Sequence, residues 1–191
     1  ETKFTIPLDS EYRVMKTYEY DQINSKLQEQ QTEPQKIGNY KYPLYENNYA
    51  RGGHGLFSTI HDFSIFTRML HTGKSIKGYE ILKEKTLKLM HTNALDDYYF
   101  PIEIPSIGIV RDVNYVNDLA AYGWGYGCRT LMDLSKNNNL GTLGEFGWAG
   151  AASTYFLVDN SKEMSAIIMT QVLNGSPELK KDFYKFIYTN F

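Results

Sequence analysis

Two neighbouring apolar segments near the C-terminus constrain the fold of this chain more than any other feature. Residues 153–159 (STYFLVD) and 164–171 (MSAIIMTQ) have the length of β-strands, and the DNSKE between them has the composition of a hairpin turn. The neighbours Phe156 and Leu157 point to opposite faces of the first strand, and both are apolar. Because the second strand is also apolar on both faces, other elements must cover this hairpin on each side.

A C-terminal helix is expected to supply one of these covers. Ser176 is suited to cap the helix and Pro177 to occupy its first position. Four apolar residues then recur at helical spacing and form a stripe that can be buried, namely Leu179, Phe183, Phe186 and Ile187.

A second helix is expected between Thr59 and Gly73. Thr59 is a good N-cap residue, Asp62 lies three residues later near the positive end of the helix, and Gly73 is suited to end it. Its apolar face contains Phe63, Phe66, Met69 and Leu70.

The rest of the chain carries weaker signals. We expect a helix at 84–92, a glycine-rich strand in 122–132, a strand at 143–149, an exposed loop at 26–35 and an irregular segment at 93–121. Helices followed by an antiparallel hairpin and a closing helix predict an α+β fold, in which an antiparallel β-sheet packs with a C-terminal helix beside a helical subdomain. We expect one domain over 1–191, with a mainly helical and loop part at 1–121 and the sheet with its helix at 122–191.

Composition excludes several functions. A net charge of −2 argues against nucleic acid as a partner, because such proteins need a basic surface. No apolar run approaches the roughly 20 residues that cross a bilayer. The chain begins at Glu1 without an initiator Met or leader, so we expect it to be a piece of a longer protein.

Few side chains suggest metal, nucleotide or thiol chemistry. We expect no metal and no cofactor, because the four histidines show no i, i+4 pairing and the glycine-rich segments lack the order of a phosphate-binding loop. His71 and His91 fall near helix C-termini, where an imidazolium is favourable. The single cysteine, Cys128, is expected to be a small buried residue. Asp96, Asp97 and Glu103 are expected to be solvated carboxylates.

Four blocks in register carry a family resemblance. They are GGHGLFSTIHDFSIFTRMLHTGK, ILKEKTLKLM, YGWGYGCRT and GEFGWAGAASTYFLVDNSKEMSAIIMTQ, and they cover roughly residues 50–175. In this order they resemble the C-terminal half of the serine β-lactamase-like hydrolases, which include class C β-lactamases, D-Ala-D-Ala carboxypeptidases, other penicillin-binding proteins and related esterases. The G-W-x-G-A-A-x-T-Y-F strand pair is closest to the esterase-like branch. The resemblance implies a partial β-lactamase/transpeptidase-like fold and a bacterial cell-envelope or other extracytoplasmic location.

The resemblance also assigns roles to one short stretch. Trp148, Ala149 and Gly150 match the family's third motif, an edge strand whose backbone pairs with the substrate amide or ester. Trp148 stands where relatives carry Lys or His. Gly150 would let the substrate approach closely, and the N–H of Ala151 would be an oxyanion donor. A competing interpretation makes Trp148 a core aromatic packed against the C-terminal helix.

The catalytic motifs of the amino-terminal half are missing. No Ser has Lys at i+3, because Ser10, Ser58, Ser135 and Ser161 are followed there by Arg13, His61, Asn138 and Met164. Three Y-x-N matches, at Tyr45, Tyr115 and Tyr188, are expected by chance in a chain rich in Tyr and Asn, and Tyr45 is the least unsuitable of them. The nucleophile is therefore not in this chain, which we expect to be inactive alone.

Two functions remain open at this point. In the first, the chain is the C-terminal part of a serine hydrolase that forms an acyl-enzyme on a small-molecule or peptide ester or amide. In the second, it is a non-catalytic, tyrosine-rich module that binds a glycan or a peptidoglycan peptide, since 16 of its residues are Tyr. A sheet without its amino-terminal strands would expose an edge, so self-association is also expected.

Overall fold

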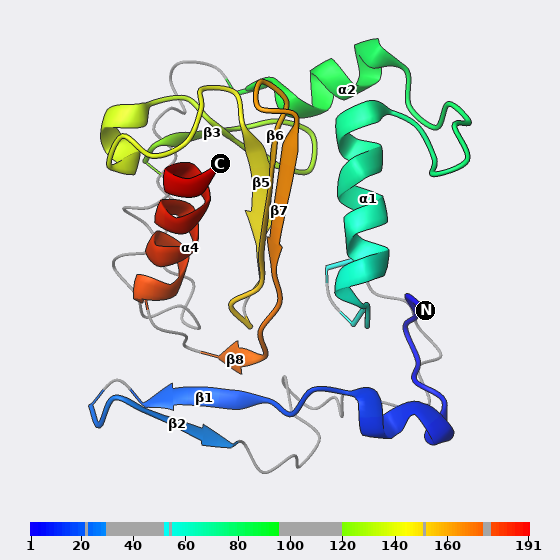
Figure 1. Ribbon diagram of the computed structural model, residues 1–191, viewed down its shortest axis with the longest axis vertical. Helices are drawn as coiled ribbons and strands as arrows, with labels where there is room; N and C mark the ends of the chain where they lie inside the picture. The colour runs from blue at the N-terminus through cyan, green and yellow to red at the C-terminus, as the bar shows by residue number, and fades with distance from the viewer. Residues whose placement is uncertain (22, 30–51, 54, 96–119, 151, 174–176) are drawn as a thin grey trace.

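A five-stranded antiparallel sheet forms the centre of the computed structural model (Figure 1). The structure describes residues 1–21, 23–29, 52–53, 55–95, 120–150, 152–173 and 177–191. The strands are β3 (Tyr122–Trp124), β4 (Arg129–Leu131), β5 (Phe146–Ala149), β6 (Tyr155–Asp159) and β7 (Met164–Ile168), in that spatial order. Each strand is antiparallel to its neighbours.

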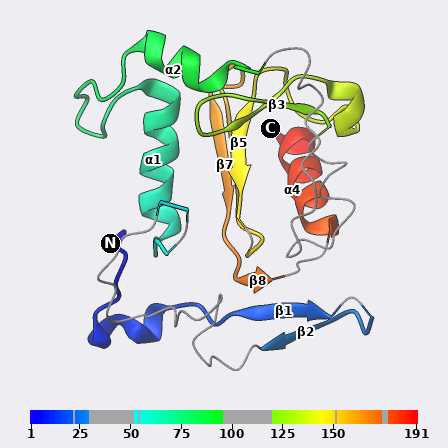
Figure 2. The same ribbon diagram turned by 180° about the vertical axis from the view of Figure 1, so that it is seen from behind.

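Helices cover the two faces of this sheet. Helix α4 (Pro177–Asn190) lies on one side and α1 (Ile60–Thr72) on the other, as both views show (Figures 1 and 2). Helix α2 (Glu84–His91) follows α1 along the chain. The α+β class and the need for cover on both faces of the hairpin are thus confirmed.

Side chains that alternate between the two faces of β6 explain why helices lie on both sides of the sheet. Phe156 contacts Phe63 of α1 with ring centroids 5.4 Å apart, whereas Tyr155 stacks with Phe183 of α4 at 6.5 Å. On the α1 side, Val158 joins a buried cluster with Leu70, Cys128 and Phe146. The core therefore has two layers, one on each face of the sheet.

Local signals set the ends of α1 as expected. The Thr59 hydroxyl accepts a hydrogen bond from the Asp62 N–H at 3.2 Å, which satisfies a free donor of the first turn. Gly73 ends the helix with φ of 72°, a left-handed conformation, and its N–H donates to the Met69 carbonyl. The predicted helix at 84–92 is also confirmed, as α2.

The C-terminal helix is present as α4, from Pro177 to Asn190. The capping role expected for Ser176 lies outside the described residues. Phe183 faces the sheet, but Phe186 is 60% exposed and contacts Phe191 instead, so Phe186 does not belong to the buried stripe.

The glycine-rich segment differs from the expected strand. Residues 122–132 form a tight hairpin of two short strands, β3 and β4, rather than one. The chain turns at Gly125 and at Gly127, whose φ of 94° suits glycine. The hydrophobic pattern of this segment is too short to distinguish a turn from a strand that contains small residues.

A second, small sheet lies below the first in Figure 1. It contains β1 (Tyr18–Asp21), β2 (Lys26–Glu29) and β8 (Val172–Leu173), in the order β2-β1-β8. The loop expected from residue 26 is therefore wrong for 26–29, although all four residues are exposed. Two short 3-10 helices, Leu8–Arg13 and Leu134–Asn137, complete the described elements.

Among the described residues, no helix combines the length and apolar character of a transmembrane span. The same residues contain no group of three or more His, Cys, Asp or Glu side chains arranged to hold a metal ion.

Candidate active site

The stretch Trp148–Gly150 lies where β5 loses one of its two neighbours. Strand β4 pairs with β5 only at Phe146 and Gly147. Trp148 and Ala149 pair with β6, opposite Phe156 and Tyr155. In the described part of the sheet, β5 is therefore an interior strand at its start and a one-sided strand at its end.

Backbone alternation shows which groups face the open side. The Gly150 N–H donates to the Thr154 carbonyl at 2.8 Å, so it points toward the β6 side. Because N–H groups alternate sides along a strand, the N–H and C=O of Ala149 point away from β6. We call this side of Trp148 and Ala149 the open edge of β5. An extended substrate fits such an edge by adding hydrogen bonds as a further strand would.

Gly150 has a structural reason for lacking a side chain. A Cβ at this position would overlap the Thr154 hydroxyl, whose residue lies on the return path to β6. The backbone turns back through Ala152 to Thr154, and the Ser153 N–H donates to the Gly150 carbonyl at 3.0 Å. Gly150 itself is exposed, so its backbone is accessible. Ala151 lies outside the described residues, and its role as oxyanion donor stays a prediction.

Trp148 packs on the face of the sheet opposite to α4. Its cross-strand partner Phe156 contacts Phe63 of α1, and the Trp148 ring meets Trp124 edge to face at 4.6 Å between centroids. The interpretation of Trp148 as a core aromatic against the C-terminal helix is therefore wrong. Trp148 is only half-buried, so part of its ring remains accessible beside the open edge.

The sequence analysis did not identify Trp124, whose position is fixed by the segment that follows α2. The Asn93 side-chain oxygen accepts the Trp124 N–H at 2.9 Å, and the Ala94 N–H donates to the Trp124 carbonyl at 2.7 Å. A Cβ at Gly123 would come within 2.6 Å of the Asn93 side chain, so this glycine permits the contact. The available signal was that the other Trp of the chain also lies among small residues, here between Gly123 and Gly125. Trp124 and Trp148 together form the aromatic wall of the candidate site.

His91, at the end of α2, packs against strands β4 and β5 in its neutral form. His91 stacks on Phe146 with centroids 3.4 Å apart, and its carbonyl accepts from the Thr130 hydroxyl. Burial, with a smaller contribution from His71, lowers the pKa of His91 to about 4. The expectation that its charged form would stabilise the helix end is wrong for this residue, because desolvation outweighs the helix dipole.

The remaining candidate groups carry no activated nucleophile. Cys128 is buried as expected, and burial raises the pKa of its thiol to about 11. The hydroxyls of Ser10, Ser135 and Ser161 donate to the carboxylates of Asp9, Asp133 and Asp159. Such contacts orient turns and caps and do not remove a proton from the hydroxyl.

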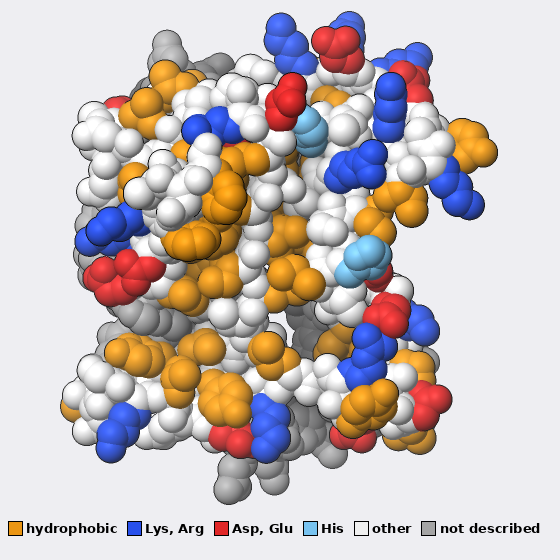
Figure 3. All heavy atoms as spheres, viewed as in Figure 1, with side chains coloured by type: hydrophobic (Ala, Val, Ile, Leu, Met, Phe, Trp, Pro, Cys, Tyr) orange, Lys and Arg blue, Asp and Glu red, His pale blue; other side chains and the backbone are white. Residues whose placement is uncertain are grey.

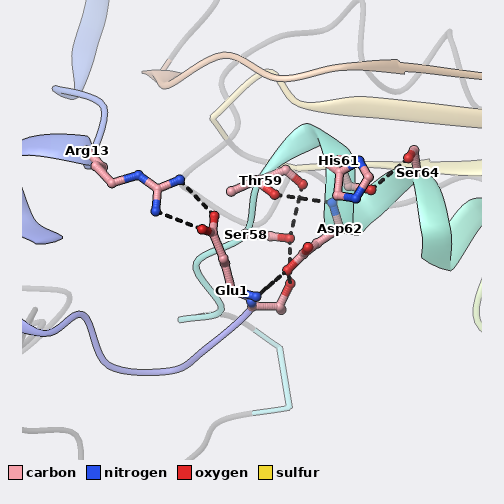
Figure 4. Close-up of polar contacts among 8 residues, drawn as sticks. Glu1, Arg13, Ser58, Thr59, His61, Asp62 and Ser64 are labelled. Carbon is pink, nitrogen blue, oxygen red and sulfur yellow. Dashed lines mark hydrogen bonds and ion pairs between the residues drawn. The ribbon is translucent and has the colours of Figure 1, made fainter.

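Ser58 belongs to a polar cluster at the start of α1 (Figure 4). Its hydroxyl lies 2.9 Å from that of Thr2. Asp62 accepts hydrogen bonds from the Glu1 nitrogen and from both the N–H and hydroxyl of Thr2, and these contacts lower the pKa of Asp62 to about 2. Arg13 in turn pairs with the Glu1 carboxylate at 2.7 Å. The S-T-x-x-D motif thus caps α1 and ties the first residues of the chain to it.

Of the three Y-x-N tyrosines, only Tyr188 is among the described residues. It lies on α4, where its hydroxyl donates to the carboxylates of Glu145 and Asp159. Burial, followed by the nearby Glu145 charge, raises the pKa of Tyr188. A general base needs the opposite shift, and Tyr188 faces the side of the sheet away from Trp148. Tyr188 is therefore a structural residue. Tyr45 and Tyr115 lie outside the described residues, as do Asp96, Asp97 and Glu103.

One family model and two curated proteins are similar to this chain in sequence. A family model described as Beta-lactamase matches residues 1–187. Protein Rv1367c and the uncharacterized protein MT1414, both from Mycobacterium tuberculosis, are each 28% identical to this chain over 138 residues, which are 71% of the chain and 31% of theirs.

Solved structures show a similar fold at low identity. The simvastatin synthase LovD of Aspergillus terreus, as the LovD6 mutant, superposes with a TM-score of 0.74 at 18% identity, over 99% of this chain and 46% of its own. EstCE1, a hydrolase with promiscuous acyltransferase activity, gives 0.72 at 16% identity over 98% and 46%. The chain spans less than half the length of these proteins and about a third of the mycobacterial ones.

Proposed function

Because this chain belongs to the beta-lactamase family, we propose that it carries one half of an acyl-transfer active site. The complete protein would be a serine hydrolase that cleaves an ester or amide through an acyl-enzyme. This chain would supply the strand that binds the substrate and one oxyanion donor. The serine nucleophile and its base would come from the remaining part of the protein.

The observation that supports this proposal best is the open edge of β5 beside the aromatic wall. In the described part of the chain, the Ala149 N–H and C=O point where β4 has ended, and an extended substrate would pair with them there. Such pairing would hold the scissile carbonyl near Ala151, two residues after Ala149. The N–H of Ala151 and the N–H of the nucleophile would then stabilise the oxyanion, each donor being worth about 3–4 kcal/mol in the transition state.

The proposed reaction has two steps. The serine oxygen attacks the carbonyl carbon and passes its proton to the base, and collapse of the tetrahedral intermediate releases the alcohol or amine with that proton. Water, or an acceptor alcohol, then attacks the acyl-enzyme and releases the acid or a new ester. The residues of this chain bind and orient the acyl group in both steps.

Trp148 indicates which substrates the site prefers. A cation at this position would pair with a substrate carboxylate, whereas the half-buried indole against Trp124 offers an apolar surface. We therefore favour neutral esters or amides over β-lactams, which carry a carboxylate.

A fluorophosphonate probe tests the division of the active site. The 191-residue chain and a longer protein from the same reading frame would be treated with the probe and analysed by mass spectrometry. We expect covalent labelling of the longer protein on a serine outside this chain, and no labelling of the chain alone. Labelling of a serine within the chain would refute the claim that its nucleophile lies elsewhere.

The same experiment separates the proposal from the binding-module alternative. If the reading frame encodes neither Ser-x-x-Lys nor Y-x-N within about 200 residues upstream, and the longest product is unlabelled, the enzyme proposal fails. Binding of a peptidoglycan stem peptide or glycan to that unlabelled product would then support the tyrosine-rich module.

A further inference from the structure

The segment 74–89 combines a positive charge with exposed apolar side chains. It contains five lysines and two glutamates, a net charge of +3, in a chain whose net charge is −2. All five lysines are exposed. Four large apolar side chains in the same segment are at least half exposed: Ile76 (56%), Tyr79 (70%), Ile81 (55%) and Leu89 (50%). Single exposed apolar residues are ordinary, but four of them among lysines need an explanation.

The exposure is built into an ordered turn. Ser75 and Tyr79 are joined by a backbone hydrogen bond of 2.8 Å, and the Tyr79 N–H also donates to the Ser75 hydroxyl. Lys74 and Glu80 form a β-bridge across this turn. The N–H of Ile81 donates to the Gly73 carbonyl at the end of α1. The backbone thus holds Ile76, Tyr79 and Ile81 outward at defined positions.

Helix α2 also carries lysine and exposed apolar side chains. Leu87 and His91 are its buried positions, and Leu87 packs against Gly73. Lys85 and Leu89 lie on the opposite face, because they are offset by two residues from the buried pair. Figure 3 shows hydrophobic side chains at the projecting corner where the loop before α2 lies in Figure 1, with Lys or Arg side chains around them. We call residues 74–89 the basic corner.

We propose that the basic corner docks the protein on an anionic phospholipid bilayer. Tyr79 and the two isoleucines enter the headgroup region, where amphipathic and aliphatic side chains are favourable, and the lysines contact lipid phosphates. Charge complementarity selects this partner, because the patch is positive while the chain as a whole is negative. An acidic peptide would match the lysines but would leave the isoleucines and the tyrosine without an apolar partner.

The proposal predicts binding that depends on lipid charge and on salt. The 191-residue chain would be sedimented with vesicles of phosphatidylcholine, either pure or with one third phosphatidylglycerol. We expect sedimentation with the anionic vesicles only. Raising the salt concentration should weaken it, because screening shortens the range of the surface potential.

Matched variants assign the binding to the basic corner. Lys83→Gln, Lys85→Gln and Lys88→Gln should each lower the partition coefficient by about fivefold, the contribution of one lysine near an anionic surface. Ile76→Ser with Ile81→Ser should also lower it, with the salt dependence retained. Lys181→Gln with Lys185→Gln removes lysines, and Phe186→Ser removes a large apolar side chain, from exposed positions of α4. Both variants should leave binding unchanged. All these positions are exposed, so circular dichroism should show the same fold in each variant.

Several results would overturn the proposal. Equal binding to neutral and anionic vesicles would remove the role of the lysines. Equal losses in the α4 variants would assign binding to general charge or hydrophobicity. Binding to polyglutamate without binding to vesicles would identify the partner as an acidic protein segment instead.

Discussion

At the scale of one residue, the proposed function depends most on Trp148. Its indole lies beside the open edge of β5 and against Trp124, so this position offers apolar area in place of a positive charge. The neighbouring small residues serve the backbone: Gly147 and Gly150 lie where a Cβ would overlap the facing strand or its return loop. The largest side chain and the smallest ones therefore serve two different surfaces of one strand.

Replacing Trp148 with lysine in the complete protein should shift its substrate preference. The new ammonium would attract a substrate carboxylate, while the apolar wall would lose its main surface. We expect kcat/KM for a neutral ester to fall by roughly tenfold or more relative to an ester that carries a carboxylate, measured on the two substrates in parallel. Trp148→Phe serves as the control and should keep the preference for the neutral ester. Unchanged ratios for Trp148→Lys would contradict the assignment of this residue to the site.

Glu145 and His91 lie on opposite faces of the sheet, and their contributions to stability should change with pH in opposite directions. Burial raises the pKa of Glu145 to about 7, with Tyr188 and Arg129 acting in the opposite direction. A folded-state pKa above the ordinary 4.5 means that the contribution of Glu145 to stability is lost as pH rises from about 4.5 through 7. His91 has the opposite sign: its pKa near 4 means that stability is lost as pH falls from 6.5.

The variant Glu145→Gln should reveal this compensation. Glutamine keeps a polar partner for Tyr188 and cannot ionise, so only the His91 contribution remains between pH 4.5 and 7. We expect the free energy of unfolding of the variant to rise over this range more steeply than that of the wild type, by at most about 3 kcal/mol. Urea denaturation at several pH values measures the difference. Parallel pH profiles for the two proteins would show that Glu145 is ionised throughout.

At the scale of elements, the sequence predicted those parts whose periodicity matched their packing. Helix α1 has a cap, an apolar face and a terminal glycine in its sequence. The structure confirms the cap, the glycine and the burial of Leu70, whereas Phe66 of the predicted face is 43% exposed. Strands β6 and β7 were recognisable because each is apolar over several consecutive residues. Strand β2 was missed because its four residues are exposed and it is held by hydrogen bonds to β1, which leave no hydrophobic pattern.

The candidate site could be assigned only in part from the sequence. The family motif assigns Trp148, Ala149 and Gly150 to it, and this assignment stays a prediction, whereas the position of Trp124 depends on a contact from Asn93, 31 residues earlier, that no local pattern encodes. Glu145 and Tyr188 are likewise 43 residues apart. Buried polar contacts between distant elements are fixed by the packing of the whole fold, so single-sequence patterns do not identify them.

Strand β5 should tolerate no side chain at Gly147. A Cβ there would overlap the backbone carbonyl of Phe156 on the neighbouring strand, and a backbone group cannot move aside as a flexible side chain does. We expect Gly147→Ala to lower the free energy of unfolding by about 1–3 kcal/mol, measured by urea denaturation. The control is Gly53→Ala, where a Cβ meets nothing within 4 Å, and it should change stability by no more than about 0.5 kcal/mol. A loss for Gly147→Ala no larger than that of the control would contradict the close packing of β5 on β6.

At the scale of the whole molecule, the described residues combine a sheet covered on both faces with an edge strand that has one neighbour. Helices α1 and α4 cover the faces, but β7 is the last described strand of the sheet and pairs only with β6. Most of its residues are partly exposed. The chain spans less than half of the similar solved structures.

The isolated chain should therefore self-associate through β7. An edge strand with free N–H and C=O groups pairs readily with another copy, and an inward-pointing charge is a natural device against such pairing. We expect analytical ultracentrifugation to show dimers that increase with protein concentration, and Ala166→Lys on β7 to weaken dimerisation by roughly tenfold, about 1.4 kcal/mol. Thr189→Lys adds the same charge at an exposed position of α4 and should leave the dimer unchanged. A dimer that resists Ala166→Lys but is lost in Thr189→Lys would place the interface on α4 instead of on the sheet edge.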